Sequence, residues 1–331
     1  MRGTCNERVT IKKDGIKLDG NGLAVLDGAG LPPTTGEFNG VMTIDGARRV
    51  VIQGFTIQNG SGEGVLARRG AAFTLRDSIV HQNGFTGVAV SDHSDAHLEN
   101  LTITQNLFGL DVFNTSNAVL RGNIDVTDNF VHGITASTSS VDLRHAQLNI
   151  SNNGGFGAVL NGATMAISGF DTAQGSSITA NNNQCGLVAG GGGRFNIIGT
   201  PSTPPGANVI TVKNNADCGI WLPGSGSLES PSGAGKFIVE GNSVGIRLGD
   251  NSTALIIGGA RVQSNTSEGL LADGAGALTF VSVPPNPSVI LGNGTDVSLH
   301  FGTRATFGDV TIGMIFTDGT AVCRGLPPTC P

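Results

Sequence analysis

An Asn that precedes a Gly-apolar pair recurs about every 23 residues along most of this 331-residue chain. The asparagines are Asn59, Asn83, Asn106, Asn129, Asn153, Asn183, Asn215, Asn242 and Asn265. The glycines that follow them are Gly64, Gly87, Gly109, Gly133, Gly157, Gly186, Gly219, Gly245 and Gly269, at steps of 23, 22, 24, 24, 29, 33, 26 and 24 residues. A repeat of this length indicates stacked structural units that bury one shared core.

Each repeat combines short apolar stretches with a polar turn. In one repeat these are residues 87–90, the turn 91–94 and a longer stretch over 96–104, within which apolar and polar residues alternate. Alternation with period two is typical of strands with one buried face. The 52 glycines and the absence of segments with helical spacing agree with β structure. The sequence therefore predicts an all-β, single-stranded solenoid of about 11 to 12 coils, each contributing to three sheets.

These repeats, from about Val9 to about Phe316, resemble the right-handed parallel β-helix proteins of the pectin-lyase-like superfamily. The resemblance implies a single domain over 1–331, with coils over about 9–316 and a C-terminal cap over 317–331. That superfamily contains polysaccharide lyases, glycoside hydrolases and epimerases, but also adhesins and tailspikes. The resemblance is therefore specific for the fold and not for an activity.

Two further features concern the shape of the coils. The recurrent Asn at one corner predicts a ladder in which side-chain amides bond along the stack. Four later repeats carry extra residues at 171–175, 200–206, 230–235 and 283–287. Because these insertions fall in the same part of the repeat, we expect them to stack into a ridge that walls a groove. The alternative is that surface loops tolerate extra length.

Two of the five cysteines occupy equivalent positions, because Cys185 and Cys218 each precede the marker glycine of their repeat. Vertical neighbours in a stack lie about 4.8 Å apart, which is within the range for a disulfide. The alternative is that both are small buried apolar residues. Cys323 and Cys330 are predicted to close a terminal loop, which leaves Cys5 unpaired. Two such pairs would indicate an oxidising compartment.

The residue two positions after each marker glycine is predicted to face outward. This column contains Leu66, Ala89, Asp111, Thr135, Val159, Val188, Trp221, Arg247, Leu271 and Ser298. Asp111 is its only carboxylate, and is therefore the main catalytic candidate, with Arg68 and His132 assisting. Arg69, Asp92 and His93 are candidate substrate contacts nearby. The alternatives are a packed histidine at His132 and solvated turn charges at the arginines.

Trp221 and Arg247 are the substrate-binding candidates of the later repeats. An outward aromatic ring beside a ridge of insertions suits stacking against a sugar, whereas the inserted loops could instead fold over Trp221. The turn 92–97 holds four potential metal ligands, but its spacing matches no known loop. No metal site is therefore assigned and no cofactor is expected to be required, although calcium at this turn is retained as an open option.

Charge and hydropathy narrow the classes of partner. The net charge of −6 and the lack of a basic stripe argue against nucleic acid, and no apolar run is long enough to span a bilayer. We expect a secreted, periplasmic or cell-surface protein that binds a polysaccharide on an outer sheet face. If it is an enzyme, it would be a polysaccharide lyase, epimerase or glycoside hydrolase. The alternative is a non-catalytic structural or adhesin-type module.

Overall fold

The computed structural model describes residues 2–32, 40–168, 175–199, 204 and 207–325. Every element in these ranges is a β-strand, and the parallel strands stack as a right-handed solenoid of about 12 turns, so the predicted fold class is confirmed. None of the described residues forms a helix long and apolar enough to cross a membrane. The chain divides into two compact units, unit 1 over Met1–Gly155 and unit 2 over Phe156–Pro331. The expectation of one domain over 1–331 stays a prediction.

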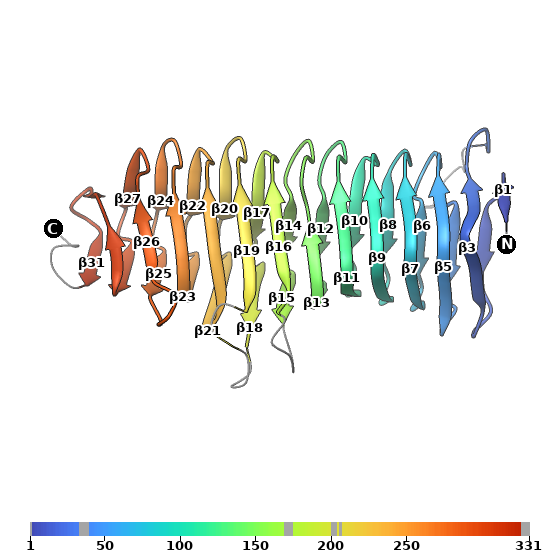
Figure 1. Cartoon of the computed structure of the whole chain (residues 1–331), viewed down its shortest axis with the longest axis horizontal. Helices are drawn as coiled ribbons and strands as arrows, with labels where there is room; N and C mark the ends of the chain where they lie inside the picture. Colours follow the sequence, from blue (N-terminus) through green and yellow to red (C-terminus); the bar gives the residue numbers. More distant parts are fainter. Residues whose placement is uncertain (1, 33–39, 169–174, 200–203, 205–206, 326–331) are drawn as a thin grey trace. The chain divides into compact units, whose positions relative to one another are not determined.

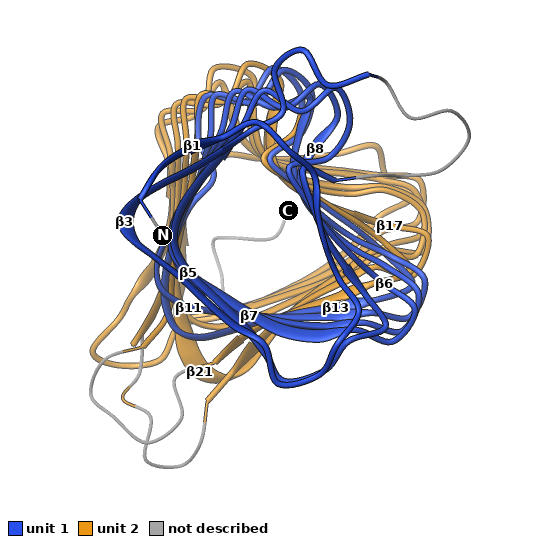
Figure 2. Ribbon diagram, turned by 90° about the vertical axis from the view of Figure 1, so that its right-hand side faces the viewer, with its two compact units in different colours: residues 1–155 blue, residues 156–331 orange. Residues whose placement is uncertain are grey.

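Unit 1 is built from two kinds of strand that alternate along the chain (Figure 1). The longer ones belong to sheet A: β1 (Gly3–Cys5), β3 (Lys17–Asp27), β5 (Val50–Gln58), β7 (Ala72–His81), β9 (Asp95–Thr104), β11 (Asn117–Thr127) and β13 (Ser140–Asn149). The shorter ones belong to sheet B: β2 (Val9–Ile11), β4 (Met42–Asp45), β6 (Val65–Arg68), β8 (Thr86–Val90), β10 (Phe108–Val112) and β12 (Ile134–Ser137). Figure 2 shows the strands of unit 1 surrounding its interior.

The chain forms two sheets, where three were expected, because sheet A bends in the middle of each long strand. The residues at the bend have positive φ: Gly54, Asp77, Asn100, Gly122 and His145. A single left-handed residue redirects a strand without ending it. The long strands therefore have a first half before the bend and a second half after it, and these halves take the place of two separate sheets.

Unit 2 repeats this alternation with interruptions. Its sheet A strands are β15 (Thr164–Ser168), β16 (Ser177–Asn181), β18 (Arg194–Ile198), β19 (Asn208–Lys213), β21 (Ser227–Glu240), β23 (Thr253–Gln263), β25 (Ala277–Val281), β26 (Ser288–Leu291), β28 (Arg304–Gly308), β29 (Val310–Ile312) and β31 (Val322–Gly325). Its sheet B strands are β14 (Ala158–Asn161), β17 (Cys185–Gly190), β20 (Cys218–Leu222), β22 (Val244–Leu248), β24 (Glu268–Asp273), β27 (Thr295–His300) and β30 (Ile315–Thr317).

The insertions share one place in the coil, as predicted. They separate β15 from β16, β18 from β19 and β25 from β26, and they produce the register shift between Ser230 and Gly235 within β21. Residues 169–174, 200–203 and 205–206 of these segments lie outside the described residues. Strand β31 lies in the predicted cap and pairs with β28, so part of the predicted cap forms one more strand of sheet A.

Columns of apolar side chains fill the interior. In unit 1 one column, set by the strand register, contains Ile52, Leu75, Leu98, Leu120 and Leu143, and every member is fully buried. Removing such side chains from water drives the stacking of the coils at about 25 cal/mol per Å² of apolar surface. The same alternation turns the intervening residues outward.

The predicted Asn ladder is present in both units. Side-chain amides bond from Asn83 through Asn106 and Asn129 to Asn153, and from Asn183 through Asn215, Asn242 and Asn265 to Asn293. Asn59 is not a member, because its amide donates to Asp27, and Gly60 takes the ladder position with its N–H 2.9 Å from Asn83 Oδ1. Each buried amide thus satisfies polar groups that would be costly to leave unpaired.

The cysteine predictions have separate outcomes. Cys185 and Cys218 are disulfide-bonded, with their Cα atoms 4.5 Å apart, which confirms the first pair. Cys5 is a free thiol. Cys330 lies outside the described residues, so the second pair stays a prediction.

Candidate functional site

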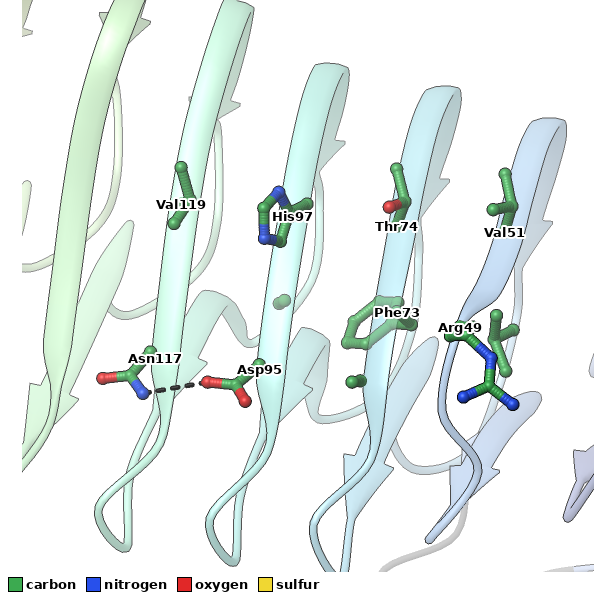
Figure 3. A pocket seen from close by; sticks show the side chains of 11 residues that line it. Arg49, Val51, Phe73, Thr74, Asp95, His97, Asn117 and Val119 are labelled. Carbon is green, nitrogen blue, oxygen red and sulfur yellow. Dashed lines mark hydrogen bonds between the residues drawn. The ribbon is translucent and has the colours of Figure 1, made fainter. Parts of the chain in front are cut away.

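An open groove of about 470 Å³ crosses the first half of sheet A in unit 1. We call it the sheet-A groove; its lining comprises Arg49, Val50, Val51, Ala72, Phe73, Thr74, Asp95, Ala96, His97, Asn117 and Val119. These residues belong to β5, β7, β9 and β11 or directly precede one of them, so the groove runs across four successive coils (Figure 3).

The register of the sheet explains the order of side chains in the groove. Val51 pairs with Thr74, Thr74 with His97 and His97 with Val119, which places these four residues in one column. The residues one position further along each strand form the buried Ile52 column of the core. Because alternate residues of a strand point to opposite faces, the Val51 column points outward.

Hydrogen bonds fix the polar groups at one edge of the groove. Asn117 Nδ2 donates to Asp95 Oδ1 over 2.9 Å, and Ser140 Oγ donates to Asn117 Oδ1 over 2.6 Å. Arg49 Nη2 lies 3.3 Å from Asp14 Oδ2, but the Arg49 side chain is 77% exposed, so this ion pair holds the guanidinium weakly. The lining thus contains a cation, an anion and an amide, all accessible to a ligand.

The exposed His97 lies at the centre of the groove and has no hydrogen-bond partner in the described part of the chain. Figure 3 shows its ring between Thr74 and Val119. An imidazole offers one donor and one acceptor when neutral, and both are available here.

A second outward column borders the groove on the side of the bend. It contains Asp19, Gln53, Arg76, Glu99 and Arg121. Gln53 Nε2 donates to Asp19 over 2.7 Å, and Arg76 Nε donates to Gln53 Oε1 over 3.0 Å. The backbone N–H of Asn21 and the amide of Gln53 hold the pKa of Asp19 below its usual value. This column extends the polar surface of the groove.

The predicted contacts Arg69, Asp92 and His93 lie in the turns that lead into β7 and β9, next to the edge of the groove. Asp92 accepts a hydrogen bond from the amide of Asn114. The structure pairs Arg69, together with Arg68, with the carboxylate of Asp45: Arg69 Nη1 lies 3.2 Å and Arg68 Nε 3.4 Å from its oxygens.

Asp111 lies away from the sheet-A groove, on β10 of sheet B, and His132 lies in the turn that leads into β12. The pairing of Leu66, Ala89, Asp111 and Thr135 confirms that these residues share one column of sheet B, but Leu66 and Ala89 are buried, and only Asp111 and Thr135 are half-buried. Burial raises the pKa of Asp111, while hydrogen bonds from Thr135 Oγ1, 2.6 Å away, and from the backbone of Val112 oppose this rise.

His132 packs beside Phe108, with ring centroids 5.9 Å apart, and burial lowers its pKa. The structure places Asp111 on β10, opposite Thr135 of β12, and His132 in the turn just before β12, beside Phe108 at the start of β10. It does not bring Arg68 to them, because Arg68 lies on β6 and β8 intervenes.

Trp221 lies outward on β20, as predicted, but not beside the insertions. Its column is confirmed by the pairing of Val188, Trp221, Arg247 and Leu271. Trp221 packs against the Cys185–Cys218 pair and Phe156, and the guanidinium of Arg247 lies 5.8 Å from its ring centroid. The insertions interrupt sheet A, whereas Trp221 belongs to sheet B; Figure 2 shows β21 of sheet A at the lower left and β17 of sheet B at the right. The prediction that Trp221 lies in a groove beside the ridge of insertions is therefore wrong.

Metal ions in proteins are ligated by His, Cys, Asp and Glu side chains. Among the described residues, three such ligand atoms come together only at Cys185, Asp217 and Cys218, and there the two sulfurs are bonded to each other. In the turn 92–97, Asp92 and Asp95 accept hydrogen bonds from Asn114 and Asn117. Calcium at this turn stays a prediction.

Sequence reasoning missed His97 and Arg49 as groove residues. The marker glycines, from which the sequence predicts outward columns, lie at the start of the short strands of sheet B and carry no information on sheet A. The signal for the groove is present in the sequence: 95–99 alternates polar and apolar residues, and its polar residues repeat the positions of Ala72, Thr74 and Arg76 one coil earlier.

Comparison with known proteins adds a family match. Residues 39–202 match the family model described as "Right handed beta helix region". No curated protein matches the sequence. The A-module of mannuronan C-5 epimerase AlgE6 from Azotobacter vinelandii is similar in structure, with 14% identity over 98% of this chain and 80% of that chain and a TM-score of 0.43. The catalytic domain of a GH87 α-1,3-glucanase in complex with nigerose shows 12% identity over 98% of this chain and 62% of that chain, with a TM-score of 0.26.

Proposed function

We propose that this chain, a right-handed parallel β-helix protein, binds a polysaccharide along the sheet-A groove. The observation that carries the proposal is the groove itself, which presents outward side chains from four successive coils. Successive coils are spaced at about 4.8 Å, and the sugar units of an extended polysaccharide recur at a similar spacing. A linear polymer can therefore meet equivalent positions on one coil after another.

The chemistry of the lining suits sugars. Asp95, His97 and Asn117 supply hydrogen-bond acceptors and donors for hydroxyl groups, while Val51 and Val119 supply apolar surface for the faces of sugar rings. Arg49 and Asp95 carry opposite charges, so the lining demands neither an acidic nor a basic polymer.

His97→Ala is expected to weaken polysaccharide binding about tenfold, because it removes the central hydrogen-bonding group from the groove. Binding is measured by affinity electrophoresis through gels that contain acidic or neutral polysaccharides. The matched control is Thr102→Ala, which truncates an outward residue of the same strand beyond the bend. Equal binding by His97→Ala and the wild type would reject the groove as the site.

A second candidate function, acid–base chemistry on a polysaccharide, is favoured by the surroundings of Asp111. A carboxyl group with a raised pKa can act as an acid, and a histidine with a lowered pKa can act as a base. Asp111 lies on β10, and His132 lies in the turn before the next strand of sheet B, β12; a lyase or epimerase uses both an acid and a base. Reproducible formation of unsaturated uronate or new reducing ends, abolished by Asp111→Asn, would support an enzyme. Binding without turnover on the same panel would support a non-catalytic module.

Asp111→Asn is also expected to raise the melting temperature at pH 7. Since the folded-state pKa of Asp111 lies above the unfolded value of 3.8, the ionised group destabilises the fold at higher pH. The gain should shrink as the pH falls through the folded-state pKa, and vanish below 3.8. Calorimetry between pH 3 and 8 measures this trend, with the exposed Asp77→Asn as control. A gain that does not change with pH would contradict the assigned burial of the charge.

We also propose a location outside the cytoplasm, at the cell surface, in the periplasm or in the medium. The Cys185–Cys218 bond supports this, because disulfides persist in oxidising compartments. Polysaccharides are accessible to proteins in those places.

A further inference from the structure

A second hollow, of about 590 Å³, lies at the corner where sheet A passes into sheet B in unit 1. Its lining consists of Gln82, Asn83, Gly84, Gln105, Asp128 and Phe130, and we call it the Phe130 hollow. It shares no residue with the sheet-A groove and contains none of the candidate catalytic or substrate-binding residues predicted from the sequence, although Asn83 belongs to the predicted Asn ladder.

Three polar side chains of the hollow repeat from coil to coil. Gln82, Gln105 and Asp128 each directly precede a ladder Asn, and their φ values are 55°, 56° and 56°, respectively. They therefore occupy the same position in three successive turns. All three are exposed, and none of their side chains hydrogen-bonds to another residue in the described ranges. The hollow thus presents a row of available amide and carboxylate groups.

Phe130 adds an aromatic ring to this row. It is 73% exposed, more than any other large apolar residue in the described part of the chain. Its backbone is held in place, because Phe130 N–H donates to Asn106 O over 2.9 Å and Gly154 packs closely against Phe130 O. Gly84 also lines the hollow, and because it has no side chain it leaves the hollow open. An exposed Phe ring has only two side-chain torsions, so stacking a ligand on it costs little conformational entropy.

We propose that the Phe130 hollow binds a neutral, extended oligosaccharide, with a sugar ring stacked on Phe130 and its hydroxyls bound by Gln82, Gln105 and Asp128. The amides supply both donors and acceptors, as hydroxyl groups require. The lining contains one carboxylate and no Lys, Arg or His, so an acidic sugar would meet repulsion without a compensating cation. The spacing of the row along three coils matches an extended chain of sugar units better than a compact ligand.

The test is affinity electrophoresis of the full chain through gels that contain a neutral β-glucan, xylan, mannan or starch, with polygalacturonate as the acidic comparison. The wild type should be retarded by at least one neutral polymer. Phe130→Ala should weaken that retardation about tenfold, and Gln105→Ser should weaken it less. Phe316→Ala, at another exposed phenylalanine, is the matched control and should bind as the wild type does.

The outcomes separate this site from the sheet-A groove. If His97→Ala retains the retardation that Phe130→Ala loses, the hollow binds sugar independently of the groove. Absence of retardation by every neutral polymer, or retardation that Phe130→Ala leaves unchanged, would overturn the proposal. Stronger retardation by polygalacturonate, lost in Phe130→Ala, would contradict the assignment to neutral sugars.

Discussion

Asn106→Ala is expected to lower the free energy of unfolding by roughly 3 kcal/mol or more. Asn106 Oδ1 accepts hydrogen bonds from the backbone N–H of Asn83, 3.0 Å away, and from its side-chain amide. Asn106 Nδ2 donates to Val80 O, Thr104 O and Asn129 Oδ1. Truncation leaves several of these buried groups without a partner, at about 1 to 3 kcal/mol for each unsatisfied group.

Urea denaturation followed by linear extrapolation measures this loss. Asn123→Ala is the matched control, because it removes an exposed Asn from the neighbouring strand β11. If the two variants lost the same small amount of stability, the ladder would be incidental to the fold. A large loss confined to Asn106→Ala would show that the buried amides hold successive coils together.

The Cys185→Ala, Cys218→Ala double variant is expected to lose about 3 to 4 kcal/mol of stability. The bond links residues 33 apart in sequence, and a cross-link of that span removes much of the conformational freedom of the unfolded chain. Both sulfurs are buried among Val188, Val244 and the ring of Trp221, so the variant also loses packing.

Trp221 reports this unfolding directly, because it is the only tryptophan of the chain. Its fluorescence in a urea titration gives the midpoint for the wild type and for the double variant. Thiol titration of the unfolded, unreduced wild type is the control, since it must not detect Cys185 or Cys218. A loss below about 1 kcal/mol would mean that the cross-link stabilises the fold far less than its span implies.

The features that could be predicted from the sequence are those that repeat along it. The spacing of the marker glycines predicted the coil, the equivalence of Cys185 and Cys218 predicted the disulfide, and the outward position of Asp111 followed from period-two alternation. Each of these features depends only on which residues recur at one position of the coil. The hydrophobic pattern of the sequence is enough to identify that position.

The features that could not be predicted depend on where the chain turns. Asp77, Asn100 and His145 adopt positive φ at the bend of sheet A, and a non-glycine residue gives little sign of this in sequence. Because the position of the bend could not be predicted, the sequence did not show that the insertions and Trp221 belong to different sheets. The pairing of Arg68 with Asp45 likewise required the register between coils.

The central claim, that a polysaccharide lies in the sheet-A groove, is tested most directly by covalent footprinting of the protein with and without the polymer it binds. The account predicts protection of residues 49–53, 72–76, 95–99 and 117–121, the first halves of β5, β7, β9 and β11, with their second halves unchanged. Protection that spared these four segments and fell only on the outer face of sheet B would contradict it.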